Sequence, residues 1–148
     1  PAALGANVSL QQRLNVSHDG RSQTADALLE IDTSDLHLVL LVGPRRMLTL
    51  SWDGGELQQQ RDPKLPEVLQ GERFIDDIQL AYWPATALRG ALPAGWSLRD
   101  YPCQRLLERN GEIAVQIDYS TDTRWLGHIV VDHLSQGYRL SIDSVAAQ

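Results

Sequence analysis

Alternating apolar and polar residues recur in both halves of the chain, and this two-residue period constrains the fold more than any other feature. Between residues 8 and 16 the apolar side chains occupy even positions, which is typical of a strand with one face in the core. Strands are predicted in this way, with their flanking turns, at residues 8–16, 23–31, 47–53, 56–61, 104–109, 112–119, 125–134 and 138–145. Residues 36–42 are apolar on both faces, which predicts a central strand. Turns such as Asp19-Gly20 and Asn110-Gly111 separate neighbouring strands, because these residues accept the dihedral angles of a tight reversal. The chain is therefore predicted to be mainly antiparallel β.

The middle of the chain changes to a helical period. Between residues 65 and 83 the apolar positions that share one helix face are Phe74, Ile75, Ile78, Ala81 and Tyr82. Pro84 ends this helix, and a second short helix is predicted over residues 84–92. Because both helices fall between two sets of strands, we expect one curved antiparallel sheet with helices covering one face. A chain of 148 residues is expected to form a single domain, residues 1–148.

Composition argues against several classes of function. The 13 basic and 19 acidic residues give a net charge of −6, whereas a nucleic-acid-binding domain usually carries a basic face. The longest apolar run, residues 36–42, is far shorter than the ~18–20 residues that span a bilayer. Cys103 is the one cysteine, so no internal disulfide can form. We expect no nucleic-acid partner.

Histidines and acidic residues offer little for catalysis or metal binding. Four histidines occur, namely His18, His37, His128 and His133. His128 and His133 lie five residues apart on one predicted strand, so they should project from opposite faces and cannot bind one ion together. Asp76 and Asp77 diverge by about 100° on a helix, so we expect both on a solvated helix face. We therefore expect no metal, no cofactor and no enzyme.

Aromatic and aliphatic residues supply the more informative surface. The tryptophans are Trp52, Trp83, Trp96 and Trp125. If the helices close tightly on the sheet, these side chains form a filled core, which the residues alone favour. If helices and sheet stand apart, the same side chains line an apolar cavity of the kind that holds lipids.

Two short segments resemble known bacterial families. The run Gly-Pro-Arg-Arg-Met-Leu-Thr-Leu at 43–50, a following helix and Pro-Ala-Thr-Ala-Leu-Arg-Gly-Ala-Leu-Pro-Ala-Gly at 84–95 resemble, in this order, the outer-membrane receptor of the lipoprotein-sorting pathway. The segment Phe-Ile-Asp-Asp-Ile-Gln-Leu-Ala-Tyr-Trp-Pro at 74–84, with Leu-Pro-Ala-Gly-Trp at 92–96, is similar to a family of bacterial lipoproteins. That family is encoded in clusters that make aryl-polyene pigments or related fatty-acid-like products.

The resemblance covers about residues 8–145 and implies a LolA/LolB-like fold. This fold is an unclosed antiparallel half-barrel of about 11 strands, with two or three helices as a lid over a hydrophobic cavity. The resemblance also implies a flexible segment at residues 1–7, after a lipid-modified cysteine that precedes Pro1. Such an anchor would hold the domain at the periplasmic face of the outer membrane.

Together, the resemblance and the pattern predict a set of cavity-lining residues. They are Leu38, Leu40, Leu48, Leu50, Trp52, Ile78, Tyr82, Leu88, Leu92 and Ile117. Arg45 stands where the sorting receptor exposes a membrane-inserting leucine, and Arg46 follows it. Two arginines favour contact with an anionic membrane surface or an acidic partner over hydrophobic insertion.

Three hypotheses follow for the function. The first is a non-enzymatic, membrane-anchored binding protein or carrier for an acyl chain, a lipoprotein lipid anchor or a polyene-like product. The alternative is an assembly subunit with a filled core that docks on membrane-bound proteins of lipid or polyene synthesis or export. The third is an acyl-processing hydrolase that uses Cys103 or a carboxylate.

Overall fold

All ten strands of the chain form a single antiparallel sheet. The computed structural model describes residues 1–67 and 69–147. In chain order the strands are β1 (Val8–His18), β2 (Arg21–Ile31), β3 (Leu36–Val42), β4 (Arg45–Trp52), β5 (Leu57–Arg61), β6 (Trp96–Tyr101), β7 (Gln104–Arg109), β8 (Glu112–Tyr119), β9 (Gly127–His133) and β10 (Tyr138–Ala146). The other elements are the 3-10 turn η1 (Ala2–Leu4) and the helices α1 (Gly71–Tyr82) and α2 (Ala85–Arg89).

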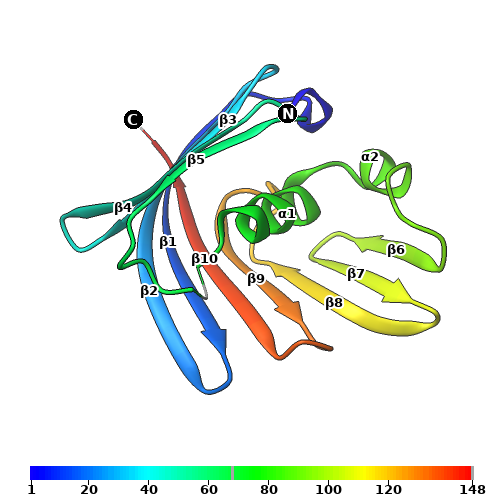
Figure 1. Cartoon of the computed structure of the whole chain (residues 1–148). Helices are drawn as coiled ribbons and strands as arrows, with labels where there is room; N and C mark the ends of the chain where they lie inside the picture. Colours follow the sequence, from blue (N-terminus) through cyan, green and yellow to red (C-terminus); the bar gives the residue numbers. More distant parts are fainter. Residues whose placement is uncertain (68, 148) are drawn as a thin grey trace.

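The strand order explains why the helices form a lid. The order is β5-β4-β3-β2-β1-β10-β9-β8-β7-β6, so the first and last strands pair in the middle of the sheet. The two edges are therefore β5 and β6, which are consecutive in sequence. The segment that joins them must pass from one edge to the other, and it carries both helices. Figure 1 shows α1 inside the concave side of the curved, unclosed sheet and α2 beside β6.

Two predicted hairpin turns are confirmed by their backbone angles. Asp19 and Gly20 have φ of 51° and 75°, and Asn110 and Gly111 have φ of 52° and 85°. Two consecutive positive φ values match the right-handed twist of the strands they connect. A third turn has Gly43 at φ 61° followed by Pro44, and it pairs Val42 with Arg45.

Helix α1 begins later than the helical period predicts. Residues 65–67 and 69 were expected to be helical, as was residue 68, which lies outside the described residues. The guanidinium of Arg61 instead donates to the carbonyls of Leu65, Pro66 and Leu69. The Pro66 carbonyl also accepts from the N–H of Leu69, three residues later, and not from the residue four positions later as in an α-helix. The helix therefore starts at Gly71, and Pro84 separates it from α2, which is also shorter than predicted.

Strand β6 was missed by the sequence reading. Only Leu98 is buried in this strand, because β6 is a sheet edge and most of its side chains meet solvent. A strand with one buried residue gives no clear two-residue period. The predicted half-barrel with a helical lid is confirmed, with ten strands in place of about 11.

The core lies between the concave face of the sheet and α1. The alternation in β1 and β2 puts Leu10, Leu14, Ala27 and Leu29 on this face. Leu4 of η1 is also buried, at 5% exposure. Among residues 1–67 and 69–147, no helix has the length and hydropathy needed to span a membrane.

Candidate ligand-binding groove between the helices and the sheet

An amphipathic groove of about 680 Å³ opens between the two helices and strands β6 to β9. Its apolar lining consists of Leu80, Leu88, Ala91, Leu92, Trp96, Leu107 and Val115. Its polar lining consists of Gln70, Glu72, Arg73, Asp76, Asp77, Gln79, His133 and Gln136. This volume falls within the ~300–1,000 Å³ of typical small-molecule sites. The groove therefore offers both an apolar wall and charged groups to a ligand.

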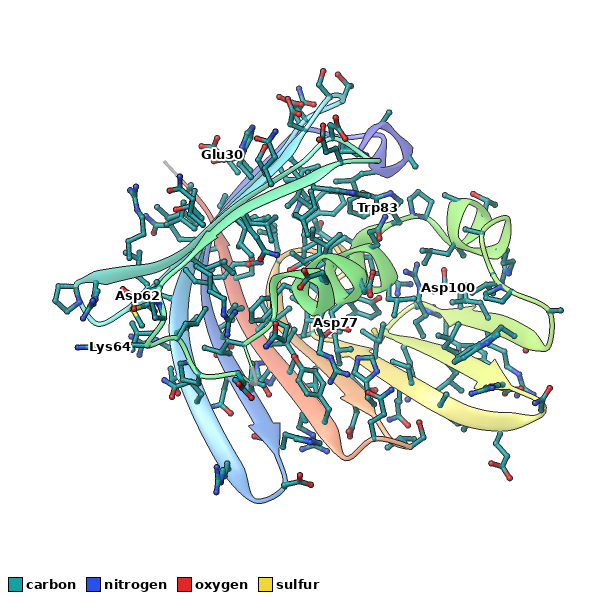
Figure 2. All side chains as sticks on the ribbon, viewed as in Figure 1. Glu30, Asp62, Lys64, Asp77, Trp83 and Asp100 are labelled. Carbon is teal, nitrogen blue, oxygen red and sulfur yellow. The ribbon has the colours of Figure 1, made fainter. Side chains whose placement is uncertain are left out.

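A hydrogen bond to a buried carboxylate joins the lid to the sheet at the polar side of the groove. The Nε2 atom of His133, on β9, lies 2.7 Å from Oδ1 of Asp77, on α1. Asp77 is completely buried, and Figure 2 shows it between α1 and the strands. Its other oxygen, Oδ2, is also buried and has no hydrogen-bond partner within the described part of the chain. One acceptor of this carboxylate is thus left unsatisfied.

Arg73 of α1 closes over the same region. Its guanidinium carbon lies 4.2 Å from the ring centroid of Tyr138, and its Nη2 donates to Oε1 of Gln136 at 2.8 Å. His133 contacts the edge of the Tyr138 ring, with 5.3 Å between ring centroids. Burial, and next the charge of Asp77, raise the pKa of the Tyr138 hydroxyl, which therefore stays protonated. The guanidinium of Arg73 therefore already has two partners, the ring of Tyr138 and the side-chain amide of Gln136.

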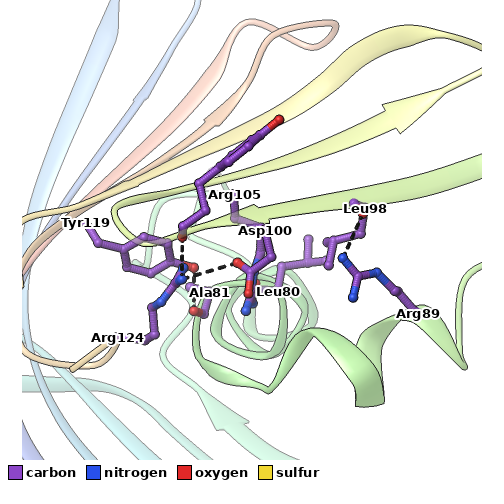
Figure 3. Close-up of polar contacts among 9 residues, drawn as sticks. Leu80, Ala81, Arg89, Leu98, Asp100, Arg105, Tyr119 and Arg124 are labelled. Carbon is purple, nitrogen blue, oxygen red and sulfur yellow. Dashed lines mark hydrogen bonds and ion pairs between the residues drawn. The ribbon is translucent and has the colours of Figure 1, made fainter. Parts of the chain in front are cut away.

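Two side chains from the sheet hold the C-terminal end of α1. Arg105 Nη1 donates to the carbonyl oxygen of Leu80, and Tyr119 Oη donates to that of Ala81, both at 2.6 Å (Figure 3). The last carbonyls of a helix lack partners within the helix and carry its negative dipole end. A buried guanidinium and a hydroxyl therefore stabilise the lid in the closed position.

A small network orients Arg105. Its Nε lies 3.1 Å from Oδ1 of Asp100, and Nη2 of Arg124 lies 3.3 Å from the same oxygen. Arg124 also stacks on Tyr119, with its guanidinium carbon 4.1 Å from the ring centroid. Burial is the main reason why the pKa of Tyr119 is raised, so its hydroxyl remains a donor at neutral pH.

Gln12 anchors the lid at a third point. This side chain, on β1, donates from Nε2 to the hydroxyl of Tyr82 at 2.8 Å and to Oγ of Ser144 at 3.3 Å. Burial raises the pKa of Tyr82 well above its ordinary value. The lid therefore contacts β1, β7, β8 and β9 through polar side chains.

The predicted cavity residues divide between the groove and the core. Leu88 and Leu92 line the groove. The core, away from this lining, contains Leu38, Leu40, Leu48, Leu50, Ile78, Tyr82 and Ile117, and Trp52 packs partly buried against it. Whether these core residues contact a ligand stays a prediction.

The two arginines predicted to meet a membrane or partner are the first residues of β4, while Gly43 and Pro44 form the tip of the turn. Arg45 Nη2 lies 2.9 Å from Oδ2 of Asp62, so its charge is partly neutralised. Both arginines are exposed. Their contact with a surface remains a prediction.

Three earlier interpretations can be compared with the structure. His128 and His133 do project from opposite faces, because His128 pairs with Asp143 at the surface and His133 with the buried Asp77. The interpretation of Asp77 as solvated was wrong, although Asp76 is exposed. Adjacent helix positions diverge, and here one of them turns toward a histidine of the sheet. Cys103, which the hydrolase hypothesis invokes, is exposed in the turn between β6 and β7.

Sequence reasoning missed the polar residues that tie the lid to the sheet. Gln12, Arg105 and His133 occupy core-facing positions in strands whose other core-facing residues are mainly apolar. A polar residue at a core-facing position of an alternating strand could have indicated each of these contacts. The strand sequence could not identify the residue on the helix that each one contacts, because that depends on how the helix packs on the sheet.

Comparisons with known proteins agree with this architecture. The model of a family described as protein of unknown function, DUF3261, matches residues 9–146. No curated protein matches the chain at a significant level. The crystal structure of a LolA superfamily protein from Nitrosomonas europaea is similar, with a TM-score of 0.52 and 9% identity over 97% of this chain and 88% of that one. At this identity the likeness concerns the fold alone. The chain therefore belongs to the DUF3261 family and has a LolA-like fold.

Proposed function

We propose that this protein is a non-enzymatic carrier that binds a lipophilic ligand in the groove between its lid and its sheet. The observation that carries the proposal is the row of apolar side chains along the groove, which includes Leu92, Trp96 and Leu107. Burial of an alkyl chain against such a wall contributes about 0.8 kcal/mol per methylene. Binding of this kind needs no cofactor.

The open groove supports transfer as well as binding. It opens beside the lid, so a ligand can enter and leave while α1 keeps its apolar face in the core and its polar contacts with Arg105 and His133. A carrier requires this property.

We propose that the protein lies at the periplasmic face of the outer membrane, held by a lipid anchor that precedes Pro1. The sequence resemblance of residues 74–84 and 92–96 to bacterial lipoproteins supports this location. Candidate ligands are an acyl chain, a lipoprotein lipid anchor or a polyene-like product. The exposed Arg45 and Arg46 would then meet anionic head groups or an acidic partner.

A second candidate function is an assembly subunit with a filled core. The observation that favours it is the complete burial of Leu38, Leu40 and Leu48, each at most 1% exposed, on the β3 and β4 side of the sheet. Side chains without solvent exposure are typical of a filled core. In that case the groove would play no part in ligand binding.

Binding of an environment-sensitive lipophilic fluorophore, followed by its displacement with fatty acid, separates the two functions. The carrier predicts saturable binding that Leu92→Gln weakens, because a polar amide would replace part of the apolar wall. Leu28→Gln is the matched control, since Leu28 is 44% exposed and outside the groove. Mass spectrometry of lipids extracted after native purification would identify the ligand. No saturable binding, or equal effects of the two variants, would reject the carrier.

A further inference from the structure

The polar side of the groove has an excess of negative charge. Its lining contains the carboxylates of Glu72, Asp76 and Asp77, one arginine, Arg73, and one histidine, His133, which is bonded to Asp77. The Arg73 guanidinium is already placed over Tyr138 and bonded to Gln136. An anionic group entering here would meet three carboxylates, whereas a cation would be attracted.

A buried carboxylate oxygen without a hydrogen-bond partner indicates which kind of group a ligand would supply. Asp77 is 0% exposed, its Oδ1 is bonded to His133, and its Oδ2 has no partner among residues 1–67 and 69–147. Native proteins rarely leave a buried polar atom unsatisfied, because its desolvation is not compensated. Oδ2 can only accept a hydrogen bond when Asp77 is ionised. The missing group is therefore a hydrogen-bond donor.

Asp76 adds a second, more accessible carboxylate to the same site. It lies on the groove wall, and burial raises its pKa, followed in effect by the neighbouring charge of Asp77. Nothing in the described chain pairs with this carboxylate as a salt bridge. Neighbouring helix positions diverge, but Asp76 and Asp77 both line this groove. An ammonium group has three donors and a positive charge, so it can donate to both carboxylates.

We propose that the groove selects an amphiphile whose head carries a protonated amine, with Asp76 and Asp77 as its acceptors and the apolar wall holding its alkyl chain. This inference rests on the proposed function, because it assumes that the groove binds a lipophilic chain. It adds a chemical class of ligand, an alkylammonium head, which distinguishes the ligand from a free fatty acid.

Calorimetric titration with three amphiphiles of equal chain length tests the proposal: octylammonium, octanol and octanoate, each below its micellar concentration, at neutral pH and low ionic strength. We expect octylammonium to bind at least about tenfold more tightly than octanoate, with octanol between them, since charge-assisted hydrogen bonds are about twice as strong as neutral ones. Asp76→Asn should reduce octylammonium affinity to about that of octanol. Asp143→Asn is the control, because Asp143 is exposed and pairs with His128 outside the groove.

The outcomes separate this inference from the proposed function. Equal binding of the three amphiphiles, or preference for octanoate, would overturn the ammonium site and leave the carrier in place. Unchanged selectivity in Asp76→Asn would also overturn the assignment. Failure of all three to bind would reject the carrier together with the site.

Discussion

Replacing Arg105 by glutamine tests how strongly the sheet holds the lid. Arg105 is 2% exposed, and its guanidinium joins the Leu80 carbonyl at the end of α1 to the carboxylate of Asp100. Glutamine is shorter and uncharged, so it cannot reach both acceptors. The substitution leaves a helix-terminal carbonyl without its donor while Asp100 retains Arg124.

The two lost contacts give the expected magnitude. A hydrogen bond that involves a charged group contributes ~1.5–3 kcal/mol, and a partly exposed ion pair adds up to ~1 kcal/mol. The side chain of Asp100 is 25% exposed, so solvent screens the second contact. We therefore expect a loss of about 3 kcal/mol in the free energy of unfolding, which lowers the melting temperature by roughly 10 °C for a chain of this size.

Urea unfolding and thermal melting of the purified variants measure this loss. Arg105→Lys should lie between the parent and Arg105→Gln, because an ammonium keeps the charge but lacks the planar fork that reaches two acceptors. Arg139→Gln is the matched control, since the Arg139 side chain is 58% exposed and pairs with Asp132 on the surface. If Arg105→Gln costs less than about 1 kcal/mol, or no more than the control, the guanidinium does not hold the lid.

Three further predictions concern the groove and the surface. The affinity for octylammonium should fall as the pH is lowered through the raised pKa of Asp76, because protonation removes the negative charge that attracts the ammonium. Calorimetric titration across the acidic range measures this affinity, and an affinity that does not change with pH would contradict the prediction. In the free protein, stability depends on pH in the opposite direction from octylammonium affinity. Because folding raises the pKa of Asp76, its contribution to the free energy of unfolding is full below the unfolded pKa of about 3.8 and is lost as the pH rises through the folded pKa. His133→Ala should lower the free energy of unfolding by ~1–3 kcal/mol, because it removes the hydrogen-bond partner of the buried Asp77 carboxylate. Urea unfolding measures this loss, and an unchanged free energy of unfolding would show that the Asp77–His133 contact does not stabilise the protein. The double substitution Arg45→Glu and Arg46→Glu should abolish binding to anionic vesicles with little change in unfolding; binding that ignores both this change and added salt would assign membrane attachment to another part of the protein.

Local sequence patterns determined much of the secondary structure. The alternation at residues 112–119 predicted β8 with its observed bounds, because a strand with one buried face needs a two-residue period. The run at residues 36–42, apolar on both faces, predicted β3 with its observed bounds. Asn110-Gly111 predicted its hairpin, since both residues accept positive φ. The helical period before Pro84 predicted α1, although not its first residue. These features depend on neighbours in the chain.

Packing between distant segments decided the rest. Strands β1 and β10 pair although Leu10 and Ala146 are far apart in sequence, and this pairing makes β5 and β6 the edges that the lid must connect. The same pairing makes β6 an edge strand with mostly exposed side chains, and for this reason its sequence shows no two-residue alternation of apolar and polar residues.

The candidate site was likewise decided by tertiary structure. Asp77 appeared to be one of two surface acids, and only the position of α1 over β9 brings it against His133 and buries it. Leu88 and Leu92 line the groove while Leu38 and Leu40 fill the core, although both pairs are apolar positions of similar sequence character. The sequence by itself determined which faces are apolar, because periodicity is local. Which apolar face is filled and which remains open depends on how closely the helices approach the sheet, and that distance is determined by long-range contacts.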